Sequence, residues 1–404
     1  MKLRILHIAP NIIRGGIARV SLELTKSLSL LGSEVMLYSP EYINGLNNYI
    51  AKYYRARAIT NRLRTLSKLF EFSQPLYFSI SNRNELMKII NEEKPDIVIT
   101  HGPYATLRLL LPYNDVPWLI IVHGTYINEL RYMRYHPMKY YDKLRYMTST
   151  YTSIIYEKTV YQSLQRKFKN TYWIAVSEQT RKELVNFMKI SIGNIFKVLN
   201  GVNKDIFKPM NKYKAREILK SKFKINIDDA DIILLHVNPG PRKGTHILIK
   251  SLQYIKGKIK LLIVGKISRG SYWDYLIGLI NDIGKDRVIL LGWVDDNDLP
   301  ILYNSANITV VSSYSEGGPL ITPESLACGT PVIATNVGGN AEYLSVADLN
   351  DYLINISQYD FSRELAEKIQ AMIYDLNSIK INADLIPSWL DIAREYLKIM
   401  NDLI

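Results

Sequence analysis

The sequence predicts an α/β protein built from two doubly wound, Rossmann-like domains, each with a parallel sheet covered by helices on both faces. Short apolar runs of strand length alternate with amphipathic, helix-length segments along the chain. This alternation stops in the polar stretch 198–214, which contains an Asn-Gly pair and a proline, and then starts again. The 404 residues also exceed what one hydrophobic core usually supports. We therefore expect a first domain at 1–200 and a second at 201–385.

The first half begins as a β–α–β unit. The strand-like run "LRILHIA" is followed by a Gly-Gly turn and by apolar residues at helical spacing; Gly32 ends this helix, and "EVMLYS" forms the next strand. Further strands are expected at 96–100, 118–122 and 173–177. The last of them leads into a helix for which Ser177 is the expected N-cap.

The second half repeats this pattern. Its expected strands are "IILLHV", "KLLIVG", "VILLGWV", "ITVVSS" and "PVIAT", and helices are expected to begin near Thr245, Tyr272 and Leu299. The chain closes with an amphipathic stretch, 386–404, which we expect to pack back on the first domain. The apolar residues at helical spacing in this stretch are Leu390, Ala393, Leu397 and Met400.

Composition excludes several classes of protein. The single cysteine, Cys328, rules out an internal disulfide framework and a cysteine-based zinc site, and we expect it in the core. This cysteine usage fits a reducing cytoplasm. No apolar run approaches the roughly 20 residues that cross a bilayer, and the N-terminus lacks the cleavage site of a signal peptide. We therefore expect a cytoplasmic protein.

Positive charge is concentrated in the first half of the chain. Residues 1–200 hold 28 Lys and Arg against 14 Asp and Glu, whereas residues 201–404 hold 23 against 24. The stretch 131–147 mixes cations with Tyr and Met, a combination that suits an anionic membrane surface, a phosphorylated ligand or nucleic acid. A solvated face of Tyr-rich helices is the alternative.

Residues that directly follow strands are candidates for ligand binding, because ligands of open parallel sheets bind outside the carboxyl ends of the strands. After the first strand, Gly15 and Gly16 would let backbone amides at a helix start approach an anion, although a plain tight turn also explains them. His101 and His123, each followed by glycine, end two further strands. Each is a candidate to donate to a hydroxyl or phosphate or to move a proton, with a structural role as the alternative.

Two motifs of the second half indicate a nucleotide-sugar. In "HVNPGPRKGTH", Arg242 and Lys243 lie where cations and amide dipoles can bind a diphosphate, with a solvated pair as the alternative. In "SEGGPLITPES", Thr322 is the expected N-cap of a short helix, and the helix dipole alone favours Glu324 in its first turn. A carboxylate there would repel phosphate, so we expect Glu324 to bind a ribose diol and Glu316 to bind the sugar.

The segment "SEGGPLITPESLACGTPVIATNVGGNAEY" resembles the E-x7-E segment of the retaining glycosyltransferases of family 4, which have the GT-B fold. The resemblance covers nearly the whole chain, because "RGGIAR", "VHG", "AVSE", "NGVNKDIFKP", the "KG" of the donor loop and the terminal tryptophan helix follow in the family's order. It implies two Rossmann-like domains facing a central cleft, a nucleotide-diphosphate sugar on the second, an acceptor on the first, and transfer with the anomeric configuration retained.

The resemblance also implies roles for individual residues. Glu316 contacts the donor sugar, Lys243 stabilises the leaving diphosphate and His123 assists at the reacting carbon, so these three are the expected catalytic residues. The other expected donor-binding residues are Gly16, Asn238, Arg242, Gly317, Gly318, Leu320 and Glu324. The expected acceptor-binding residues are Arg14, Gly15 and His101.

Two positions depart from the family's pattern. Asn238 stands where the family usually has an arginine, which removes a cation that Arg242 would have to replace, and Pro319 occupies a position often held by glycine. Both changes bear on the affinity for the donor and on its identity. No metal is expected, because cations and helix dipoles would neutralise the departing charge. The acidic run 295–298 is interpreted as a helix cap rather than a metal motif.

The expected activity is transfer of a hexose from a UDP- or GDP-sugar to a glycan or polyprenyl-phosphate-linked acceptor, without a metal or other cofactor. The basic first domain predicts peripheral contact with the anionic inner membrane surface. One alternative is a nucleotide-sugar epimerase or hydrolase of the same fold. The other is a basic nucleic-acid-binding protein, which would leave the two acids and the paired histidines unexplained, so we expect no nucleic-acid partner.

Overall fold

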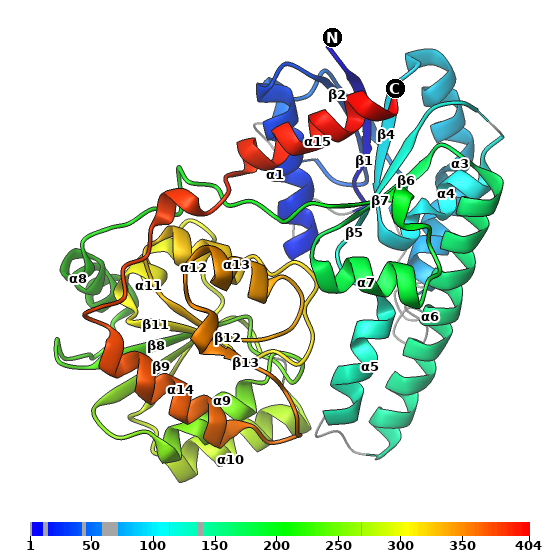
Figure 1. Ribbon diagram of the computed structural model, residues 1–404. Helices are drawn as coiled ribbons and strands as arrows, with labels where there is room; N and C mark the ends of the chain where they lie inside the picture. Colours follow the sequence, from blue (N-terminus) through cyan, green and yellow to red (C-terminus); the bar gives the residue numbers. More distant parts are fainter. Residues whose placement is uncertain are drawn as a thin grey trace. The chain divides into compact units, whose positions relative to one another are not determined.

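The structure is a computed structural model that describes residues 2–10, 15–42, 46–58, 72–112, 114–135, 140–267 and 269–404. The chain forms two compact units, whose elements are labelled in Figure 1. Within the described residues, the first unit takes in most of 2–201 together with 388–404, and the second takes in 202–387. The last helix of the chain therefore belongs to the first unit.

The first unit is built on a parallel sheet which, over its described residues, has seven strands in the order β3-β2-β1-β4-β5-β6-β7. These strands are β1 (Arg4–Ile8), β2 (Glu34–Ser39), β3 (Lys52–Arg55), β4 (Ile97–His101), β5 (Trp118–Val122), β6 (Thr171–Ala175) and β7 (Ile195–Lys197). The chain runs from β1 outward through β2 to β3 and then continues from β4 on the other side of β1. The switch point, where doubly wound sheets bind ligands, therefore lies between β1 and β4 at the carboxyl ends of these strands.

The helices of the first unit are α1 (Gly16–Leu30), α3 (Ser73–Glu93), α4 (Thr106–Leu110), α5 (Tyr126–Tyr135), α6 (Tyr140–Lys167), α7 (Glu178–Asn186) and α15 (Trp389–Leu403). The prediction that Ser177 caps α7 is confirmed, since its side chain accepts from the backbone N–H of Thr180. Helix α15 contacts α1 (Figure 1) and begins with a capping box between Ser388 and Asp391. Its buried side is formed by Trp389, Ile392, Ala393, Tyr396, Ile399 and Met400, whereas Leu390 and Leu397 are only partly buried.

The second unit repeats the architecture with a parallel sheet of six strands, counted over the residues described there, in the order β10-β9-β8-β11-β12-β13. These strands are β8 (Ile232–Val237), β9 (Ile259–Val264), β10 (Val288–Gly292), β11 (Ile308–Val311), β12 (Val332–Thr335) and β13 (Leu353–Ile354). The helices are α8 (Lys212–Phe223), α9 (Thr245–Ser251), α10 (Ser271–Ile283), α11 (Leu299–Ser305), α12 (Ile321–Ala327), α13 (Asn340–Val346) and α14 (Ser362–Asp375). The switch point of this sheet lies between β8 and β11.

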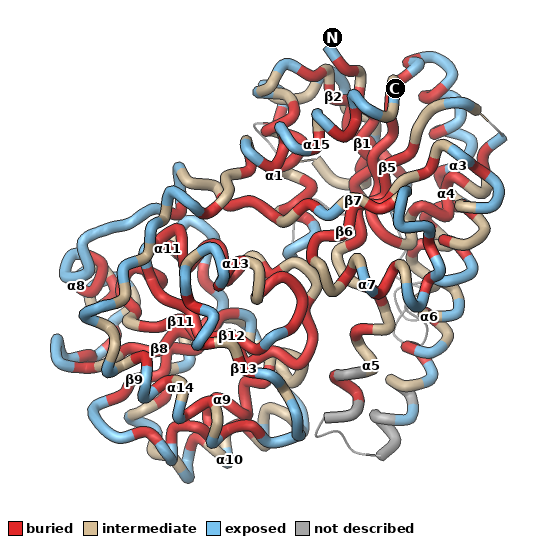
Figure 2. Tube along the Cα trace, viewed as in Figure 1, coloured by how far each residue is buried: buried red, intermediate tan, exposed pale blue. Residues whose placement is uncertain are grey.

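The central strands of both sheets are buried because they consist almost wholly of apolar residues that pack on both faces (Figure 2). All five residues of β5 are buried, and Cys328 is buried as predicted. Helices α9 and α11 begin where they are predicted to begin, and α10 begins one residue earlier. No helix of the described ranges is long and apolar enough to cross a membrane.

The predicted cap at Thr322 is wrong, and Asp298 of the run 295–298 occupies the N-cap position of α11 without a capping side-chain bond, because both side chains have other partners. Thr322 lies inside α12, and its hydroxyl donates to Oδ1 of Asn340 at 2.6 Å instead of capping the helix. The acidic run 295–298 precedes α11, but the side chain of Asp298 makes no capping hydrogen bond. It pairs instead with the ammonium group of Lys222, at 2.6 Å.

Candidate active site

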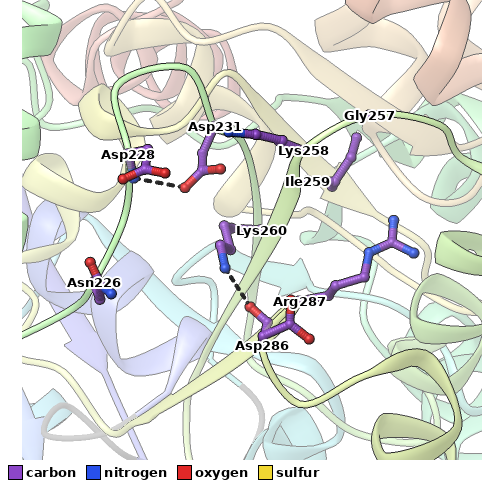
Figure 3. Close-up of a pocket in the computed structure, with 9 residues that line it drawn as sticks. All are labelled: Asn226, Asp228, Asp231, Gly257, Lys258, Ile259, Lys260, Asp286 and Arg287. Carbon is purple, nitrogen blue, oxygen red and sulfur yellow. Dashed lines mark hydrogen bonds between the residues drawn. The ribbon is translucent and has the colours of Figure 1, made fainter.

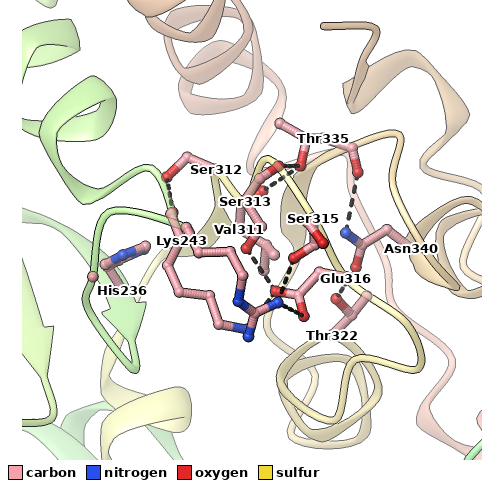
Figure 4. Close-up of polar contacts among 12 residues, drawn as sticks. His236, Lys243, Val311, Ser312, Ser313, Ser315, Glu316, Thr322, Thr335 and Asn340 are labelled. Atoms are coloured by element: carbon pink, nitrogen blue, oxygen red, sulfur yellow. Dashed lines mark hydrogen bonds and ion pairs between the residues drawn. The ribbon is translucent and has the colours of Figure 1, made fainter. Parts of the chain in front are cut away.

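The switch point of the second sheet carries a buried ion pair (Figure 4). Lys243 follows β8 and Glu316 follows β11, and Nζ of Lys243 lies 2.5 Å from Oε1 of Glu316. Arg242 joins them, because one guanidinium nitrogen lies 3.7 Å from Oε2 of Glu316 and donates to the carbonyl of Ser315 at 2.6 Å. The side chains of Lys243 and Glu316 are only 16% and 7% exposed. The structure thus brings together two cations and one acid that the sequence singles out.

The loop that carries Lys243 is fixed by a histidine of the strand before it. Nδ1 of His236 donates to the carbonyl of Val310 at 3.0 Å, which leaves Nε2 of the neutral ring to accept from the hydroxyl of Thr245 at 2.9 Å. Burial lowers the pKa of His236 to about 4, so the ring is neutral near pH 7. Oγ1 of Thr245 in turn accepts from the backbone N–H of Gly240, at 2.9 Å. These bonds join β8, β11 and the start of α9.

Gly244 lets this loop lie directly against the segment that follows β11. Its φ is +64°, and a Cβ atom at this position would lie 2.0 Å from the carbonyl oxygen of Ser312. The hydroxyl of Ser312 is within hydrogen-bond distance of the carbonyls of Lys243 and Gly244, at 3.0 and 3.2 Å. The backbone N–H of Tyr314 donates to the carbonyl of Arg242 at 2.9 Å. These contacts fix the backbone of both cations next to the acid.

Glu316 is ionised although it is buried. Burial raises the pKa of its carboxyl, but the charges of Lys243 and Arg242 and hydrogen bonds from Lys243 and Ser313 outweigh burial and lower the pKa below its usual value. The hydroxyl of Ser313 donates to Oε1 at 2.6 Å. The site therefore presents a fixed negative charge with cations directly beside it.

The second acid, Glu324, lies in the first turn of α12, as predicted. Its side chain is buried, and Oε2 accepts from the hydroxyl of Tyr303 on α11 at 3.0 Å. A hydroxyl is the kind of group that we expect to face this carboxylate, but here it belongs to the protein. A ribose diol would have to share the carboxylate with Tyr303 or replace that tyrosine.

A contact between the glycines of two loops has no counterpart in the sequence prediction. Gly338 has a φ of +59°, and a Cβ atom there would lie 2.4 Å from the carbonyl oxygen of Gly317 and 2.7 Å from that of Glu316. The backbone N–H of Gly339 donates to the carbonyl of Gly317 at 2.9 Å. The Gly-Gly pair at 338–339, in the loop that follows β12, is the sequence signal for this close approach. It holds the turn that follows Glu316.

The remaining donor-binding candidates of the second unit lie around these two loops. Asn238 is exposed, has a φ of +59°, and donates from its backbone N–H to the carbonyl of Val264 at 2.7 Å. Leu320 directly precedes α12, and Gly318 lies in the turn before it. Arg242 lies near the acid, whereas the side chain of Asn238 has no described contact with it.

The first unit places its two predicted glycines at the start of α1. Gly15 is the N-cap residue, with a φ of +94°, and Gly16 is the first residue of the helix. Both therefore lie beside the switch point of the first sheet. Arg14, which is predicted to bind the acceptor, lies outside the described residues.

A row of three histidine rings lies at the switch point of the first sheet. His7 of β1 and His101, the last residue of β4, are joined through their Nε2 atoms at 2.8 Å. Nδ1 of His101 lies 2.7 Å from Nε2 of His123, which directly follows β5, and these two rings stack with centroids 5.0 Å apart. At the other end of the row, Nδ1 of His7 lies 2.7 Å from the hydroxyl of Thr25 on α1. His7 is not among the residues predicted from the sequence to form a site, because it stands within a strand between apolar neighbours.

All three rings are neutral, because His7 and His101 are buried and the half-buried His123 is still largely removed from water. Burial lowers the pKa of His7 to about 3 and that of His123 to about 4, and it lowers the pKa of His101 well below 6.5. His101 is predicted to bind the acceptor, but its side chain is buried and both ring nitrogens have protein partners. This geometry favours a role for His101 through the half-buried ring of His123 rather than through direct contact.

The two candidate acids of the second unit, Glu316 and Glu324, contact cations and a hydroxyl rather than each other. Glu316 contacts Lys243 and Arg242, whereas Glu324 contacts Tyr303. Across the part of the chain that the structure describes, no group of three or more His, Cys, Asp or Glu side chains is arranged to hold a metal ion. The cations that lie beside Glu316 at this switch point are Lys243 and Arg242.

A separate pocket lies at the amino ends of the strands of the second sheet, opposite the candidate active site (Figure 3). Its volume is about 360 Å³, and its lining includes Asp231, Lys258 and Arg287, which precede β8, β9 and β10. On one side of the pocket, the backbone N–H of Asp228 donates to Oδ2 of Asp231 at 2.8 Å. Ligands of such sheets bind at the carboxyl ends of the strands, so this pocket at the amino ends is not the candidate active site.

Comparison with known proteins agrees with this architecture. A relative described as an uncharacterized glycosyltransferase of Methanocaldococcus jannaschii is 25% identical over 350 residues, which cover 83% of this chain and 80% of that protein. A D-inositol 3-phosphate glycosyltransferase of Catenulispora acidiphila is 32% identical over 185 residues, but these cover only 43% of this chain and 42% of that protein.

Solved structures match over the full length of the chain. Sucrose-phosphate synthase from Thermosynechococcus elongatus has a TM-score of 0.75 at 20% identity, covering 100% of this chain and 99% of that one. HepE of Anabaena in complex with UDP has a TM-score of 0.71 at 17% identity and covers 100% of both chains. At this level of identity the likeness shows the fold alone.

Family models account for both units. The model described as "Glycosyltransferase Family 4" matches residues 14–206, and the model described as "Glycosyl transferases group 1" matches residues 217–380. Together they span most of the chain, one on each sheet. The chain therefore belongs to the GT4-type glycosyltransferases and has the GT-B fold.

Proposed function

We propose that this glycosyltransferase moves a hexose from a UDP- or GDP-sugar to a glycan or lipid-linked acceptor, with the anomeric configuration retained and without a metal ion. The observation that carries the proposal is the cluster of Lys243, Arg242 and Glu316 at the switch point of the second sheet, in which Lys243 and Glu316 are largely buried. Cations fixed at the carboxyl end of a sheet suit a diphosphate, and a single acid beside them suits the hydroxyls of a sugar.

Lys243 can bind a diphosphate while it remains paired. An ammonium group carries three hydrogens, so it can bridge Glu316 and a phosphate oxygen at the same time. Negative charge that develops on the departing diphosphate would then be stabilised by Lys243 and Arg242. Preorganised contacts of this kind contribute about 100-fold each to turnover.

The carboxylates and His123 take the hydroxyl-bearing parts of the donor in this proposal. Glu316 contacts the sugar and Glu324 binds the ribose, because a carboxylate accepts hydrogen bonds from hydroxyls and repels a phosphate in direct contact with it. His123 acts at the reacting sugar. Its neutral ring, which follows from burial, lets it exchange hydrogen bonds with hydroxyls without adding a charge.

Ligands of structural neighbours support the class of donor. HepE is described in complexes with UDP, with UDP and glucose, and with UDP-glucose. Starch synthase IV of Arabidopsis thaliana is described with ADP and acarbose. These neighbours share the fold of this chain, and we propose a nucleotide-diphosphate sugar as the donor here as well.

The basic first half supports contact with an anionic membrane surface that carries a lipid-phosphate acceptor. It holds 28 Lys and Arg against 14 Asp and Glu, whereas the second half is nearly balanced. Flotation with vesicles that contain anionic phospholipid should capture the protein at low salt and release it as salt rises. Absence of binding at low salt would remove the membrane contact from the proposal and leave the chemistry unchanged.

Neither alternative function is favoured. A nucleotide-sugar epimerase or hydrolase would consume the donor without an acceptor, and a nucleic-acid-binding protein would have no use for the cluster at Glu316. The family matches and the named relatives are glycosyltransferases.

The test of the proposal is a transfer assay in the presence of a chelator. The protein is incubated with UDP- and GDP-hexoses and with a polyprenyl-phosphate-linked glycan, and products are identified by mass spectrometry. We expect a product one hexose heavier, with the anomeric configuration of the donor as seen by NMR. Release of free sugar at the same rate with and without acceptor would instead identify a hydrolase.

A further inference from the structure

Ser21 fixes the direction of the hydrogen bonds along the row of histidines. Its hydroxyl lies 2.9 Å from the carbonyl of Ile17, one turn earlier in α1, and 3.1 Å from Nε2 of His101. A hydroxyl has one hydrogen, and a carbonyl oxygen can only accept. When Ser21 donates to Ile17, it can only accept from His101, so the proton of the neutral His101 ring lies on Nε2.

The position of the proton on the other two rings follows from that of His101. Nε2–H of His101 points to both Ser21 and Nε2 of His7, so Nε2 of His7 accepts, and Nδ1 of His7 carries the proton that is donated to Thr25. Nδ1 of His101 must accept, so Nε2 of His123 carries a proton and donates it. The unprotonated nitrogen of His123 is therefore Nδ1.

The opposite direction makes fewer hydrogen bonds. In that case Nε2 of His101 carries no proton and uses its one in-plane lone pair to accept from His7, so it cannot donate to Ser21. Ser21 has one hydrogen and would keep its bond to the carbonyl of Ile17 only by losing its bond to His101. A buried row keeps the arrangement that satisfies more of its polar groups.

We propose that Ser21, through His101, fixes the tautomer of His123 so that Nδ1 of His123 presents a hydrogen-bond acceptor to a hydroxyl of the sugar. Within the described residues, Nδ1 of His123 has no hydrogen-bond partner, and the ring is half-buried. His101 and Ser21 are positioning residues, because they act on the substrate only through His123. The inference rests on the proposed function, which places His123 at the reacting sugar.

The direct test is the protonation pattern of the ring nitrogens, measured by 15N–1H correlation NMR on histidine-labelled protein. The chain has only six histidines, which can be assigned by single substitution. His236 is an internal standard, because its Nδ1 faces a carbonyl and must carry the proton. We expect His7 to match His236, and we expect His101 and His123 to carry their protons on Nε2. A proton on Nδ1 of His123 would overturn the proposal without any activity measurement.

The kinetic test uses a matched pair of variants at one position. His101→Asn keeps an acceptor close to the place of Nδ1, whereas His101→Leu removes it. We expect His101→Leu to lower kcat about tenfold, the scale of one hydrogen bond, with the KM for the donor nearly unchanged. His101→Asn should restore Nε2–H on His123 together with most of kcat. An equal loss in both variants, or no loss in His101→Leu, would contradict the proposal.

Ser21→Ala covers the case in which His101→Leu does not fold, since it removes only one hydroxyl. We expect the spectrum of this variant to show mixed tautomers at His123 and kcat to fall in proportion to the lost Nε2–H form. An unchanged tautomer in Ser21→Ala would show that Ser21 does not set the direction. If the wild-type protein transfers no sugar from any donor, the proposed function fails, while the NMR pattern still decides the tautomer.

Discussion

Each of the two units has a histidine at the matching position of its first strand, and the two rings have different hydrogen-bond partners and different roles. His7 stands in β1 next to the switch to β4, and His236 stands in β8 next to the switch to β11. Each bonds to a threonine of the helix that follows, Thr25 in one case and Thr245 in the other. The difference lies in the neighbouring strand. For His236 it offers the carbonyl of Val310, whereas for His7 it offers a second histidine ring.

This difference explains what each switch point can do. A carbonyl only accepts, so the chain of hydrogen bonds stops at Val310. The role of His236 is to hold the loop that positions Lys243. A histidine ring both accepts and donates, so the bond from His7 continues through His101 to His123. The second unit thus gathers fixed charges around Glu316, whereas the first gathers neutral rings. We propose that the charged site takes the diphosphate and that the neutral row acts on hydroxyls.

The largest effect is expected from breaking the packing of the charged site. Gly244→Ala should lower the free energy of unfolding by about 3 kcal/mol and abolish donor binding, because the new Cβ would overlap the carbonyl of Ser312. Gly240→Ala, in the same loop, is the control, since a Cβ there meets nothing within 4 Å. Chemical denaturation of both variants measures the difference. Equal stability of the two would show that the loop is not held as described.

Removing the charges themselves should come next in size. Glu316→Ala and Lys243→Ala should each lower turnover by about 100-fold, as expected for loss of one transition-state contact. Glu367→Ala, on the exposed side of α14, is the matched control for loss of an acid. Steady-state kinetics with a saturating donor provide the measurement. Near-normal turnover in the Glu316 variant would refute its assigned role.

The neutral row should make stability depend on pH. The pKa of His7 falls from 6.5 to about 3 on folding, so below pH 6.5 the unfolded chain binds a proton that the folded chain does not. The free energy of unfolding should therefore fall with decreasing pH, by about 1.4 kcal/mol per unit for each such histidine. His7→Gln should flatten the curve between pH 6.5 and 5, and His236→Gln is the matched change in the other unit. The free energy of unfolding is measured by urea titration at each pH. If it depended on pH in both variants as strongly as in the wild type, burial of a neutral ring would be contradicted.

The smallest effect is expected at the outer cation of the charged site. Arg242 lies 3.7 Å from the carboxylate and is more exposed than Lys243, so Arg242→Ala should lower turnover by only about tenfold. Arg242→Lys should recover part of this loss, because it keeps the charge but not the bond to the carbonyl of Ser315. A loss as large as that of Lys243→Ala would show that Arg242 fully replaces the arginine missing at Asn238.

The strands that could be predicted contain several consecutive apolar residues. The runs 34–39, 118–122 and 232–237 are predicted at their observed bounds, because strands buried on both faces need apolar residues at most positions. Strand β3 has the sequence KYYR and pairs only with β2 at the sheet edge, so its residues carry no such pattern. Helix α8 begins at Lys212, inside the stretch predicted as a hinge, since polar composition alone does not separate a linker from an exposed helix.

The charged site could be predicted more fully than the histidine row. Arg242, Lys243 and Glu316 stand in loops after strands, where local sequence shows that a side chain is not needed for packing. His7 lies within a strand, and only the pairing of β1 with β4 brings its ring to His101. Likewise, the bond of Ser21 to His101 spans 80 positions of the chain, and local patterns carry no information about it.

The central claim, that Lys243 and its neighbours hold a nucleotide-diphosphate sugar without a metal, is tested most directly by thermal shift in the presence of EDTA. UDP-, GDP- and ADP-sugars are added to wild-type protein and to Lys243→Ala. A ligand at 100 times its Kd adds about 2.7 kcal/mol of stability, so at least one sugar nucleotide should raise the Tm of the wild type and fail to raise that of the variant. A rise that appears only after a divalent cation is added, or an equal rise in both proteins, would contradict the account.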